Sequence, residues 1–329
     1  MEKERRVLVT GGCGYVGSVL VPKLAQRYSV IVLDSLLFGN CLDSTPNITV
    51  VQGDLRDPNL VWSLLAEATD VIHLASIAND PCSDLDPILT REVNLQATAD
   101  LVRMARERGV QRFIYASSSS VYGVQDAPSV TEDLSLNPIT LYARYKAESE
   151  KIVAEASGAG FTTVSVRSAT VCGVSPRMRF DVIVNMMAKM ALHPGVITVL
   201  GGDQQRPNIH IEDITDLYAL LLAVPPEKVQ GQVFNAGAAN HTVLEIARMA
   251  QAEIGGRIEV DPHTPDPRSY RITSHKIRQA LGFRPRHPIR QAIRDIKEAF
   301  ARGMFPDPDS DAYYNIRTMK KQLPARTTR

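Results

Sequence analysis

The chain has 329 residues, of which 44% are hydrophobic and 22% charged, and its formal net charge is +1. This composition is ordinary for a globular enzyme, and a charge so close to zero excludes bulk attraction to nucleic acid or to an anionic membrane surface. No run of about 18 apolar residues is present, so we expect no membrane partner.

The cysteines and histidines give no metal-binding pattern. Cys13, Cys41, Cys82 and Cys172 form neither a C-x-x-C pair nor a metal-ligand spacing, and His210 has no histidine or cysteine at ligand spacing. We therefore expect no metal site. Scattered thiols are typical of a reducing compartment, and the short charged N-terminus leads directly into the first strand, so we expect a cytoplasmic protein.

The first expected strand, residues 7–10, ends in a glycine-rich turn. Gly11, Gly14 and Gly17 make a G-x-x-G-x-x-G pattern before a helical stretch. Glycine permits the tight turn, lets a phosphate approach the backbone and packs the helix on the strand, and the N–H groups of the helix start favour an anion. Asp34 follows the second strand, where an acid binds ribose hydroxyls and repels a 2′-phosphate. The pattern predicts a site for NAD rather than NADP.

The first half of the chain alternates strand and helix. Strands are expected at residues 7–10, 29–33, 49–52, 71–75, 112–116 and 163–166, and helices at 18–27, 60–68, 92–108 and 142–156. Near-continuous apolar strands alternating with helices indicate a parallel sheet covered on both faces. We therefore expect an α/β fold with a doubly wound parallel sheet of the Rossmann type. Trp62 lies on the apolar face of its helix and is expected in the core.

The second half is irregular and punctuated by prolines. Helices are expected at residues 180–192, 212–224, 243–254 and 289–302. We expect an NAD-binding domain of residues 1–168 with a return segment at about 207–236, and a smaller α/β substrate lid of residues 169–206 and 237–305. Residues 306–329 are expected to form a C-terminal surface extension.

Tyr142 and Lys146 are four residues apart in an expected helix and so share a face. A lysine ammonium beside a phenol lowers the pKa of the phenol from its usual value of about 10, and the positive nicotinamide ring of NAD acts in the same sense. A tyrosine tuned in this way can take a proton from a sugar hydroxyl while hydride leaves the same carbon. A structural role for the pair is the alternative.

Four serines at residues 117–120 follow the strand at 112–116. Hydroxyls at the carboxyl end of such a strand line the crevice, where one of them can donate a hydrogen bond to an oxygen that gains charge. A serine-rich turn without a ligand is the alternative.

In their order and spacing these motifs resemble the extended short-chain dehydrogenases/reductases, and within them the nucleotide-sugar epimerase/dehydratase group of UDP-glucose 4-epimerase-like enzymes. The resemblance is carried by T-G-G-C-G-Y-V-G, Asp34, Gly53-Asp54-Leu55, His73-Leu74-Ala75-Ser76, Asn94, S-S-S-S-V-Y-G, Y-x-x-x-K and R-P-N-I-H-I-E-D at residues 206–213. It therefore covers nearly the whole chain.

The resemblance implies roles for individual residues. The implied NAD-binding residues are Gly11, Gly14, Tyr15, Val16 and Gly17 at the diphosphate, Asp34, Asp54 and Leu55 at the adenosine, and Leu74, Ala75, Ser76, Asn94, Tyr142 and Lys146 at the nicotinamide half. The implied catalytic residues are Ser118, Tyr142 as the base, and Lys146. The expected contacts to a nucleotide-diphosphate sugar are Ser118, Ser119, Tyr142, Thr170, Asn185, Arg206 and Arg268, the two arginines at the diphosphate. For Asn185, a polar residue in an apolar helix, a place on the helix surface is the alternative.

Departures from the group narrow the expected activity. Dehydratases carry Asp-Glu where Ser119 and Ser120 stand, and the decarboxylating relatives need a glutamate at Ser120, so both reactions are disfavoured. Thr170 begins the sequence T-V-C-G at the place where the group has Asn-x-Tyr-Gly. Ala78 stands where the 4-epimerase has a lysine. These two differences leave the identity of the sugar open.

We therefore expect an NAD-dependent nucleotide-sugar epimerase, acting at C4 through a transient 4-keto sugar. A homodimer is expected through the helices at residues 95–108 and 142–156. The alternatives are a nucleotide-sugar reductase, a dehydratase variant, a 3,5-epimerase that uses Cys82, or a dinucleotide-binding protein without catalytic activity.

Overall fold

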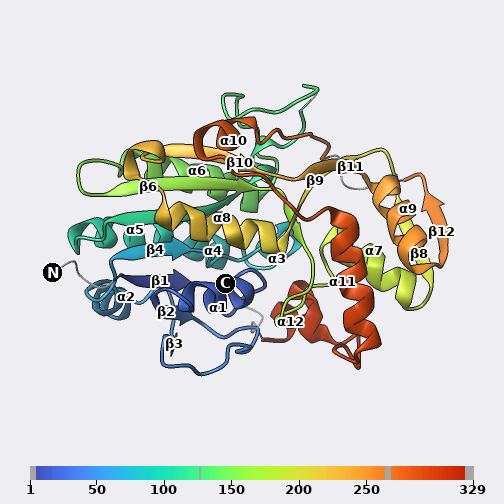
Figure 1. The fold of residues 1–329 in the computed structure, drawn as a ribbon, viewed down its shortest axis with the longest axis horizontal. Coiled ribbons are helices and arrows are strands. Elements are labelled where there is room, and N and C mark those ends of the chain that lie inside the picture. The colour runs from blue at the N-terminus through green and yellow to red at the C-terminus, as the bar shows by residue number, and fades with distance from the viewer. Residues whose placement is uncertain (1–4, 126, 264–267, 323–329) are drawn as a thin grey trace, which may run out of the picture.

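The computed structural model describes residues 5–125, 127–263 and 268–322, and its largest element is a seven-stranded parallel sheet (Figure 1). In sheet order the strands are β10 (Gln232–Ala236), β6 (Thr162–Ser168), β5 (Arg112–Ser118), β4 (Asp70–His73), β1 (Arg6–Thr10), β2 (Ser29–Asp34) and β3 (Ile48–Gln52). This order confirms the predicted doubly wound sheet. β10 was not predicted.

The strand order reverses between β1 and β4. Thr10, the last residue of β1, is in register with Leu33 of β2 on one side and His73 of β4 on the other. The loops that follow these three strands therefore start at the same edge of the sheet. In open α/β sheets, ligands bind in the crevice at this point.

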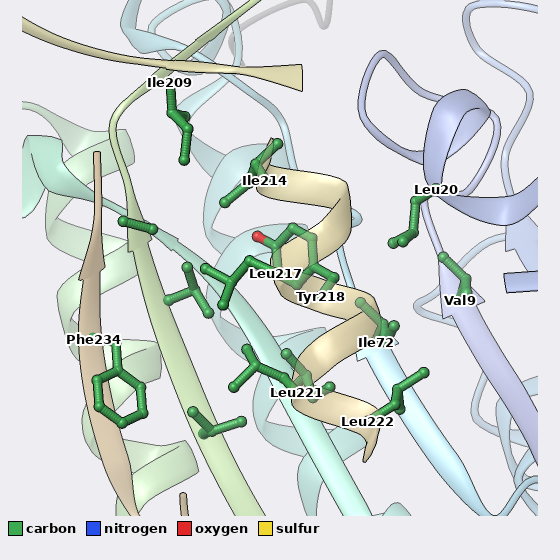
Figure 2. Close-up of a cluster of buried hydrophobic side chains, with 14 of the residues drawn as sticks. Val9, Leu20, Ile72, Ile209, Ile214, Leu217, Tyr218, Leu221, Leu222 and Phe234 are labelled. Atoms are coloured by element: carbon green, nitrogen blue, oxygen red, sulfur yellow. The ribbon is translucent and has the colours of Figure 1, made fainter. Parts of the chain in front are cut away.

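Helices cover both faces of the sheet. One face carries α1 (Gly17–Ala25) and α8 (Ile211–Ala223), and the other carries α2 (Pro58–Leu65), α5 (Ala97–Glu107) and α6 (Leu141–Glu155). Figure 2 shows the first face, where α8 directs an apolar stripe toward the strands: Ile214, Leu217, Tyr218, Leu221 and Leu222 lie among Val9, Ile72, Ile209 and Phe234. Full burial of each aliphatic side chain contributes about 1.5–3 kcal/mol, so this stripe fixes α8 on the sheet.

The smaller part of the molecule has a core of its own. It contains α7 (Ile183–Leu192), α9 (Val243–Ile254) and α11 (Ile289–Ala301), with the parallel pair β8 (Val196–Leu200) and β12 (Arg257–Asp261). Val184, Ile246 and Ile293 are among its fully buried side chains. Between the two parts lies a three-stranded sheet of β11 (Ala239–Thr242), β9 (Gln205–His210) and β7 (Thr170–Cys172).

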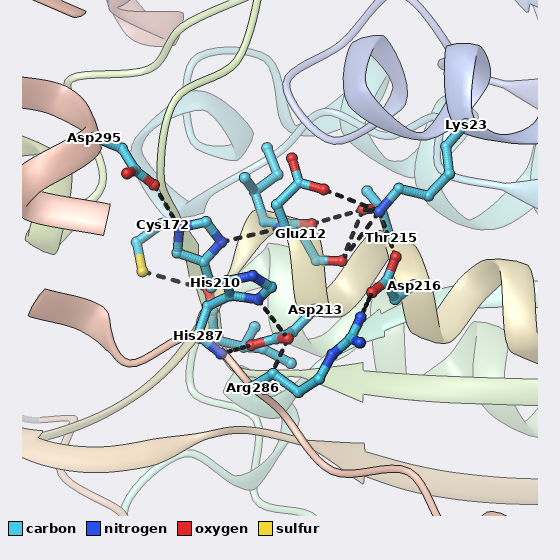
Figure 3. A network of polar contacts seen from close by, with 12 residues as sticks. Lys23, Cys172, His210, Glu212, Asp213, Thr215, Asp216, Arg286, His287 and Asp295 are labelled. Carbon is cyan, nitrogen blue, oxygen red and sulfur yellow. Dashed lines mark hydrogen bonds and ion pairs between the residues drawn. The ribbon is translucent and has the colours of Figure 1, made fainter. Parts of the chain in front are cut away.

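A polar network joins the two parts (Figure 3). The buried carboxylate of Asp213 in α8 accepts hydrogen bonds from the backbone N–H of Arg286 at 2.9 Å and of His287 at 3.0 Å. Lys23 of α1 donates to Glu212 at 3.0 Å and to Thr215 at 2.9 Å. The segment leading into α11 is therefore held on α8, and α8 on α1.

The remaining elements are short. They are α3 (Asp80–Ser83), α4 (Pro87–Arg91), a π-helical turn (Glu92–Gln96), 3-10 turns (Ser119–Tyr122, Pro226–Lys228 and Asp311–Tyr313), α10 (His275–Leu281) and α12 (Asn315–Gln322). No helix within the described ranges is long and apolar enough to cross a membrane.

The described part of the expected C-terminal surface extension is partly buried, and residues 323–329 of that extension lie outside the described residues. Asn315, Thr318 and Met319 of α12 are buried. Met319 packs with Ile77 and Leu89, which come from the region between β4 and α5. α12 is therefore part of the packed structure.

Candidate active site

A cavity of about 900 Å³ opens at the carboxyl edge of the large sheet. Its wall includes the glycine turn after β1, the segments after β2 and β4, the serines after β5, and residues of the smaller part. All the predicted site residues except Asn94 and Asn185 line it. This volume is within the range of pockets that hold a cofactor or a drug-sized ligand.

The glycine turn has the geometry that the sequence pattern predicted. Gly11 has a φ of +72°, and a Cβ on it would lie 2.7 Å from the Cα of Ala75 in the loop after β4. A Cβ on Gly17 would lie 2.5 Å from the Cα of Gly12, so only glycine lets α1 approach the turn this closely. Gly14 lies on the cavity wall. If Gly14 carried a Cβ, the nearest atom to it would belong to the same glycine turn.

Asp34 ends β2 with its carboxylate held in place. It accepts hydrogen bonds from the backbone N–H of Cys13 and of Leu36, both at 2.9 Å. Burial raises the pKa of Asp34, whereas these two donors oppose the rise. The carboxylate is thereby oriented on the cavity wall, where it can accept hydrogen bonds from a diol.

The pair predicted to be catalytic lies near the N-terminus of α6, which the side chain of Thr140 caps. The Lys146 ammonium is 3% exposed, donates to the carbonyl of Ala116 at 2.8 Å and lies 5.7 Å from the centroid of the Tyr142 ring. The Tyr142 hydroxyl has a side-chain hydrogen bond with Ser118. Ser118, Tyr142 and Lys146 thus meet on one wall of the cavity.

The expected lowering of the Tyr142 pKa is not found in the chain alone. Burial, followed by the carboxylate of Asp80, raises the pKa of Tyr142 to about 12, although Ser118 and Arg179 act in the opposite direction. Burial also lowers the pKa of Lys146 to about 7. The physical reason is desolvation, which disfavours the charged form of each group and outweighs the effect that either charge has on the other.

The serine segment is folded back on itself. Ser118 caps the 3-10 turn Ser119–Tyr122, and its Oγ accepts a hydrogen bond from the Oγ of Ser120 at 3.0 Å. The Oγ of Ser119 lies 3.2 Å from the hydroxyl of Tyr270. Hydroxyl groups therefore occupy the two positions, Ser119 and Ser120, at which the resemblance implies carboxyl groups in dehydratases or decarboxylases.

Asn94 does not line the cavity; it supports a segment that does. From the π-helical turn its side chain accepts a hydrogen bond from the backbone N–H of Ile77 at 2.7 Å and donates to the Ile77 carbonyl at 3.0 Å. π-helical turns often occur at functional sites. The helix predicted at residues 92–108 is therefore present, with residues 92–96 as a π-helical turn that continues into α5. Through Asn94 this turn fixes the segment after β4.

Asn185 is a correction to the expected sugar contact. Asn185 is 0% exposed. Its Oδ1 accepts a hydrogen bond from the backbone N–H of Gly173 at 2.9 Å. Its Nδ2 donates to the Tyr15 hydroxyl at 3.0 Å and to the Arg179 carbonyl at 2.9 Å. Both amide protons are used inside the protein. Asn185 therefore fixes the loop after β7 against the glycine turn and does not face the cavity.

Arg206 and Arg268 lie together on the cavity wall. Arg206 donates to the carbonyl of Arg268, and Arg268 forms an ion pair with Asp80. Thr170 at the start of β7 also lines the cavity. Asp80 was not predicted, although it faces both an expected ligand-binding arginine and the expected base.

Two further arginines were missed by sequence reasoning. Arg177 and Arg179 line the cavity, and the guanidinium of Arg177 lies 4.1 Å from the centroid of the Phe38 ring. Within the described part of the chain, Nε and Nη2 of Arg177 and Nη2 of Arg179 are buried without a hydrogen-bond partner. The signal that could have found them is the run P-R-M-R-F, which places two arginines in an otherwise apolar stretch.

Cys82 lies outside the cavity wall. Cys82 is fully buried, does not line the cavity, and has its pKa raised to about 11 by burial. A 3,5-epimerase that uses this thiol is therefore not supported. In the described ranges, no three histidine, cysteine or acidic side chains form a group that could hold a metal.

The residues present fit NAD. Gly11 and Gly14 leave the turn open to a diphosphate, and Asp34 can accept from ribose hydroxyls.

Comparison with known proteins agrees with this geometry. The model of the NAD dependent epimerase/dehydratase family matches residues 7–237. The chain therefore belongs to the NAD dependent epimerase/dehydratase family, as the sequence motifs had suggested.

Individual relatives point in the same direction. The UDP-glucose 4-epimerase of Lactobacillus helveticus is 31% identical over 308 residues, covering 86% of this chain and 92% of that protein. The UDP-glucuronic acid decarboxylase 2 of Arabidopsis thaliana is 31% identical over 324 residues, covering 93% of this chain and 70% of that protein. The solved structure of MoeE5 in complex with UDP-glucuronic acid and NAD has a TM-score of 0.81 at 27% identity, covering 91% of this chain and 99% of that one.

Proposed function

We propose that this chain is an NAD-dependent nucleotide-sugar epimerase that inverts C4 of its sugar through a transient 4-keto intermediate. The observation that carries the proposal is the convergence of Ser118, Tyr142 and Lys146 on the wall of a cavity that also contains Gly11 and Asp34. A base, a hydroxyl donor and a dinucleotide site are what a reversible oxidation needs.

In this proposal Tyr142 takes the proton of the C4 hydroxyl and later returns it. Ser118 donates a hydrogen bond to the same oxygen, and the Nζ of Lys146 lies 5.7 Å from the centroid of the Tyr142 ring. NAD supplies a reversible acceptor for the hydride of C4. The cavity must also let the keto sugar present its other face before the hydride returns.

The serines distinguish this reaction from those of the relatives. Ser119 and Ser120 carry hydroxyls, which cannot act as the carboxyl acid and base of a dehydratase. Ser119 is in addition engaged with Tyr270. These contacts support an epimerase over a dehydratase or a decarboxylase.

The experiment that tests the proposal is incubation of the purified protein with UDP-glucose, UDP-galactose and UDP-glucuronic acid, followed by chromatography and proton NMR. We expect an epimeric product of unchanged mass and no net consumption of NAD. Net oxidation of added NADH would indicate a reductase instead, and a loss of 18 or 44 mass units, about that of water or carbon dioxide, would indicate the other reactions of the family.

A variant pair links the activity to Tyr142. Tyr142→Phe is expected to lower kcat by at least about 100-fold because the base is lost. Tyr145→Phe is the matched control, since Tyr145 is on the same helix and does not line the cavity. Equal activity of the two variants would contradict the assignment of the base.

Two further proposals concern the assembly and its location. We propose a homodimer in which α5 and α6, which pack side by side, meet their copies in a four-helix bundle. Light scattering of the purified protein tests this. A cytoplasmic location is supported by four free cysteines, of which three are buried.

The division into domains is also a proposal. The return segment of residues 207–236 contains α8 and β10, both of which pack with the large sheet. The lid of residues 169–206 and 237–305 contains α7, α9 and α11, which share the second core.

A further inference from the structure

Three residues of helix α6 are bonded to three consecutive residues at the end of strand β5. The bonded pairs are Lys146 with Ala116, Glu150 with Ser117 and Tyr142 with Ser118. The three helical residues are spaced by four and therefore share one face of α6. Tyr142 and Lys146 form the proposed catalytic pair, and Glu150 continues the same row one helical turn further on.

The carboxylate of Glu150 is buried and held in a fixed orientation. Glu150 is 4% exposed, and its partner Arg167, in β6, is 6% exposed. Arg167 donates to Glu150 from Nη2 at 2.8 Å and from Nε at 3.0 and 3.1 Å, and such forked contacts orient a carboxylate. The hydroxyl of Ser117 donates to the same carboxylate. Both carboxylate oxygens therefore have partners, and the charge of Glu150 has a defined place.

Glu150 opposes the effect of burial on Lys146. Burial lowers the pKa of Lys146 to about 7, whereas the carboxylate of Glu150 acts in the opposite direction. The rings of Tyr115 and Tyr142 lie 4.9 Å and 5.7 Å from the Nζ of the lysine. Burial, followed by the charge of Lys146, lowers the pKa of His73 to about 3, so this imidazole is neutral. Among the described residues, Glu150 is therefore the carboxylate that favours the charged form of Lys146.

The charge of Lys146 matters for the proton transfer. An ammonium near a phenol favours the phenolate and so assists Tyr142 in taking a proton. A lysine with a pKa of about 7 is near the midpoint of its titration at neutral pH, so a further fall of this pKa removes much of the charge. Glu150 does not line the cavity, and its effect on the reaction therefore passes through Lys146.

We propose that Glu150 is a positioning residue of the catalytic pair: its carboxylate, held by Arg167 and Ser117, keeps the ammonium of Lys146 charged beside Tyr142. The proposal rests on the proposed function, in which Tyr142 exchanges a proton with the sugar. It adds to the site a buried ion pair that joins α6 to β6 outside the cavity wall.

The test is the titration of Lys146, followed by the ¹³C chemical shift of its side chain in protein labelled with ¹³C at the lysine Cε atoms. The signal of Lys146 is the one that is missing from Lys146→Met. In Glu150→Gln we expect Lys146 to lose its proton about one pH unit below wild type, because removal of a neighbouring opposite charge disfavours the ammonium.

A second variant separates the loss of charge from damage to the fold. Glu150→Gln leaves Arg167 as an unpaired cation in the interior, which is costly. In Glu150→Gln/Arg167→Met both charges are absent, and replacement of a buried ion pair by neutral groups is often neutral for stability. Lys146 should still titrate at a lower pH than in wild type, since Glu150 is the neighbour whose charge acts on it.

Glu148→Gln is the matched control, because it removes the same charge from an exposed position on α6; Lys146 should titrate in it as in wild type. The pH profile of kcat gives a second readout. Loss of the ammonium charge limits the rate at high pH, so the basic limb should move to lower pH in both Glu150 variants. A merely structural role for Glu150 would lower kcat without moving this limb.

An unchanged titration of Lys146 in both Glu150 variants would overturn the proposal, whether or not the protein is an epimerase. This titration is measured without any nucleotide sugar. A titration that moves as expected in a chain that epimerises no sugar would refute the proposed function and leave the effect of Glu150 on Lys146 intact.

Discussion

Tyr142 and Lys146 lie one helical turn apart, with the ammonium of Lys146 5.7 Å from the centroid of the Tyr142 ring. Burial shifts both groups toward their neutral forms, with a pKa of about 12 for Tyr142 and about 7 for Lys146. The lysine alone therefore does not make an acidic phenol. Burial has the largest effect on the pKa of Tyr142, and among the neighbouring charges the carboxylate of Asp80 raises it further while the guanidinium of Arg179 lowers it.

We predict that Asp80→Asn moves the acidic limb of the pH profile of kcat/KM to lower pH. The Asp80 carboxylate raises the pKa of Tyr142 and is paired with Arg268. Its removal lowers the pKa of the phenol and leaves the positive charge of Arg268 less compensated. Asp84→Asn, at an exposed position at the end of α3, should not move the limb. A limb that stays in place or moves to higher pH in Asp80→Asn contradicts this account.

Lys146 should make the stability depend on pH. Its pKa is about 7 in the folded protein and about 10.5 when unfolded, so between these values the unfolded chain binds more protons. The contribution of Lys146 to the free energy of unfolding therefore rises as the pH rises from 7 toward 10.5. We predict that the melting temperature of wild type minus that of Lys146→Met increases between pH 7 and pH 9. A constant or falling difference would show that the ammonium is not desolvated.

Asp34 should determine the choice of cofactor. Its carboxylate, oriented by Cys13 and Leu36, repels a 2′-phosphate. We predict that Asp34→Asn lowers the preference for NAD over NADP by at least about tenfold, since a like-charge contact costs several kcal/mol. Binding of both cofactors, measured by calorimetry, tests this. An unchanged ratio of the two dissociation constants would place the ribose elsewhere.

The network around Asp213 should be important for stability. Asp213, whose side chain is 1% exposed, accepts two backbone N–H bonds and contacts Nδ1 of the partly exposed His287 at 2.9 Å. Asp213→Ala leaves these groups without a partner and should lower the free energy of unfolding by about 2–4 kcal/mol. Asp216→Ala, which breaks partly exposed ion pairs with Lys23 and Arg286, should cost about 1 kcal/mol or less. Urea denaturation of both variants gives the comparison, and equal losses would contradict it.

Local signals in the sequence account for the parts of the site that were predicted. Gly11, Gly17 and Asp34 lie within or next to the β1–α1–β2 unit, where neighbouring residues determine the conformation. Tyr142 and Lys146 could be predicted to lie close together because residues four apart share one face of a helix. The strand and helix ranges of the first half follow from the same kind of pattern.

The residues that were missed depend on distant parts of the chain. Arg177, Arg179 and α12 reach the cavity only because distant parts of the chain fold together. The run P-R-M-R-F marks the two arginines as unusual but does not show where they lie. Asn185 was predicted from the sequence to contact the sugar. Its amide group is instead hydrogen-bonded to Gly173 and Tyr15 inside the protein. Trp62, predicted in the core, is 38% exposed, with the guanidinium of Arg108 4.3 Å from its ring centroid. The guanidinium of Arg108 thus lies over the ring as a cation–π partner.

The most direct measurement of the central claim uses a nucleotide sugar that carries deuterium at C4 in unlabelled water. If the hydride of C4 leaves and returns within one site, the epimeric product keeps its deuterium at C4, as proton NMR will show, and Tyr142→Phe forms almost none of it. A product that has lost the deuterium would contradict reversible oxidation at C4 within one site.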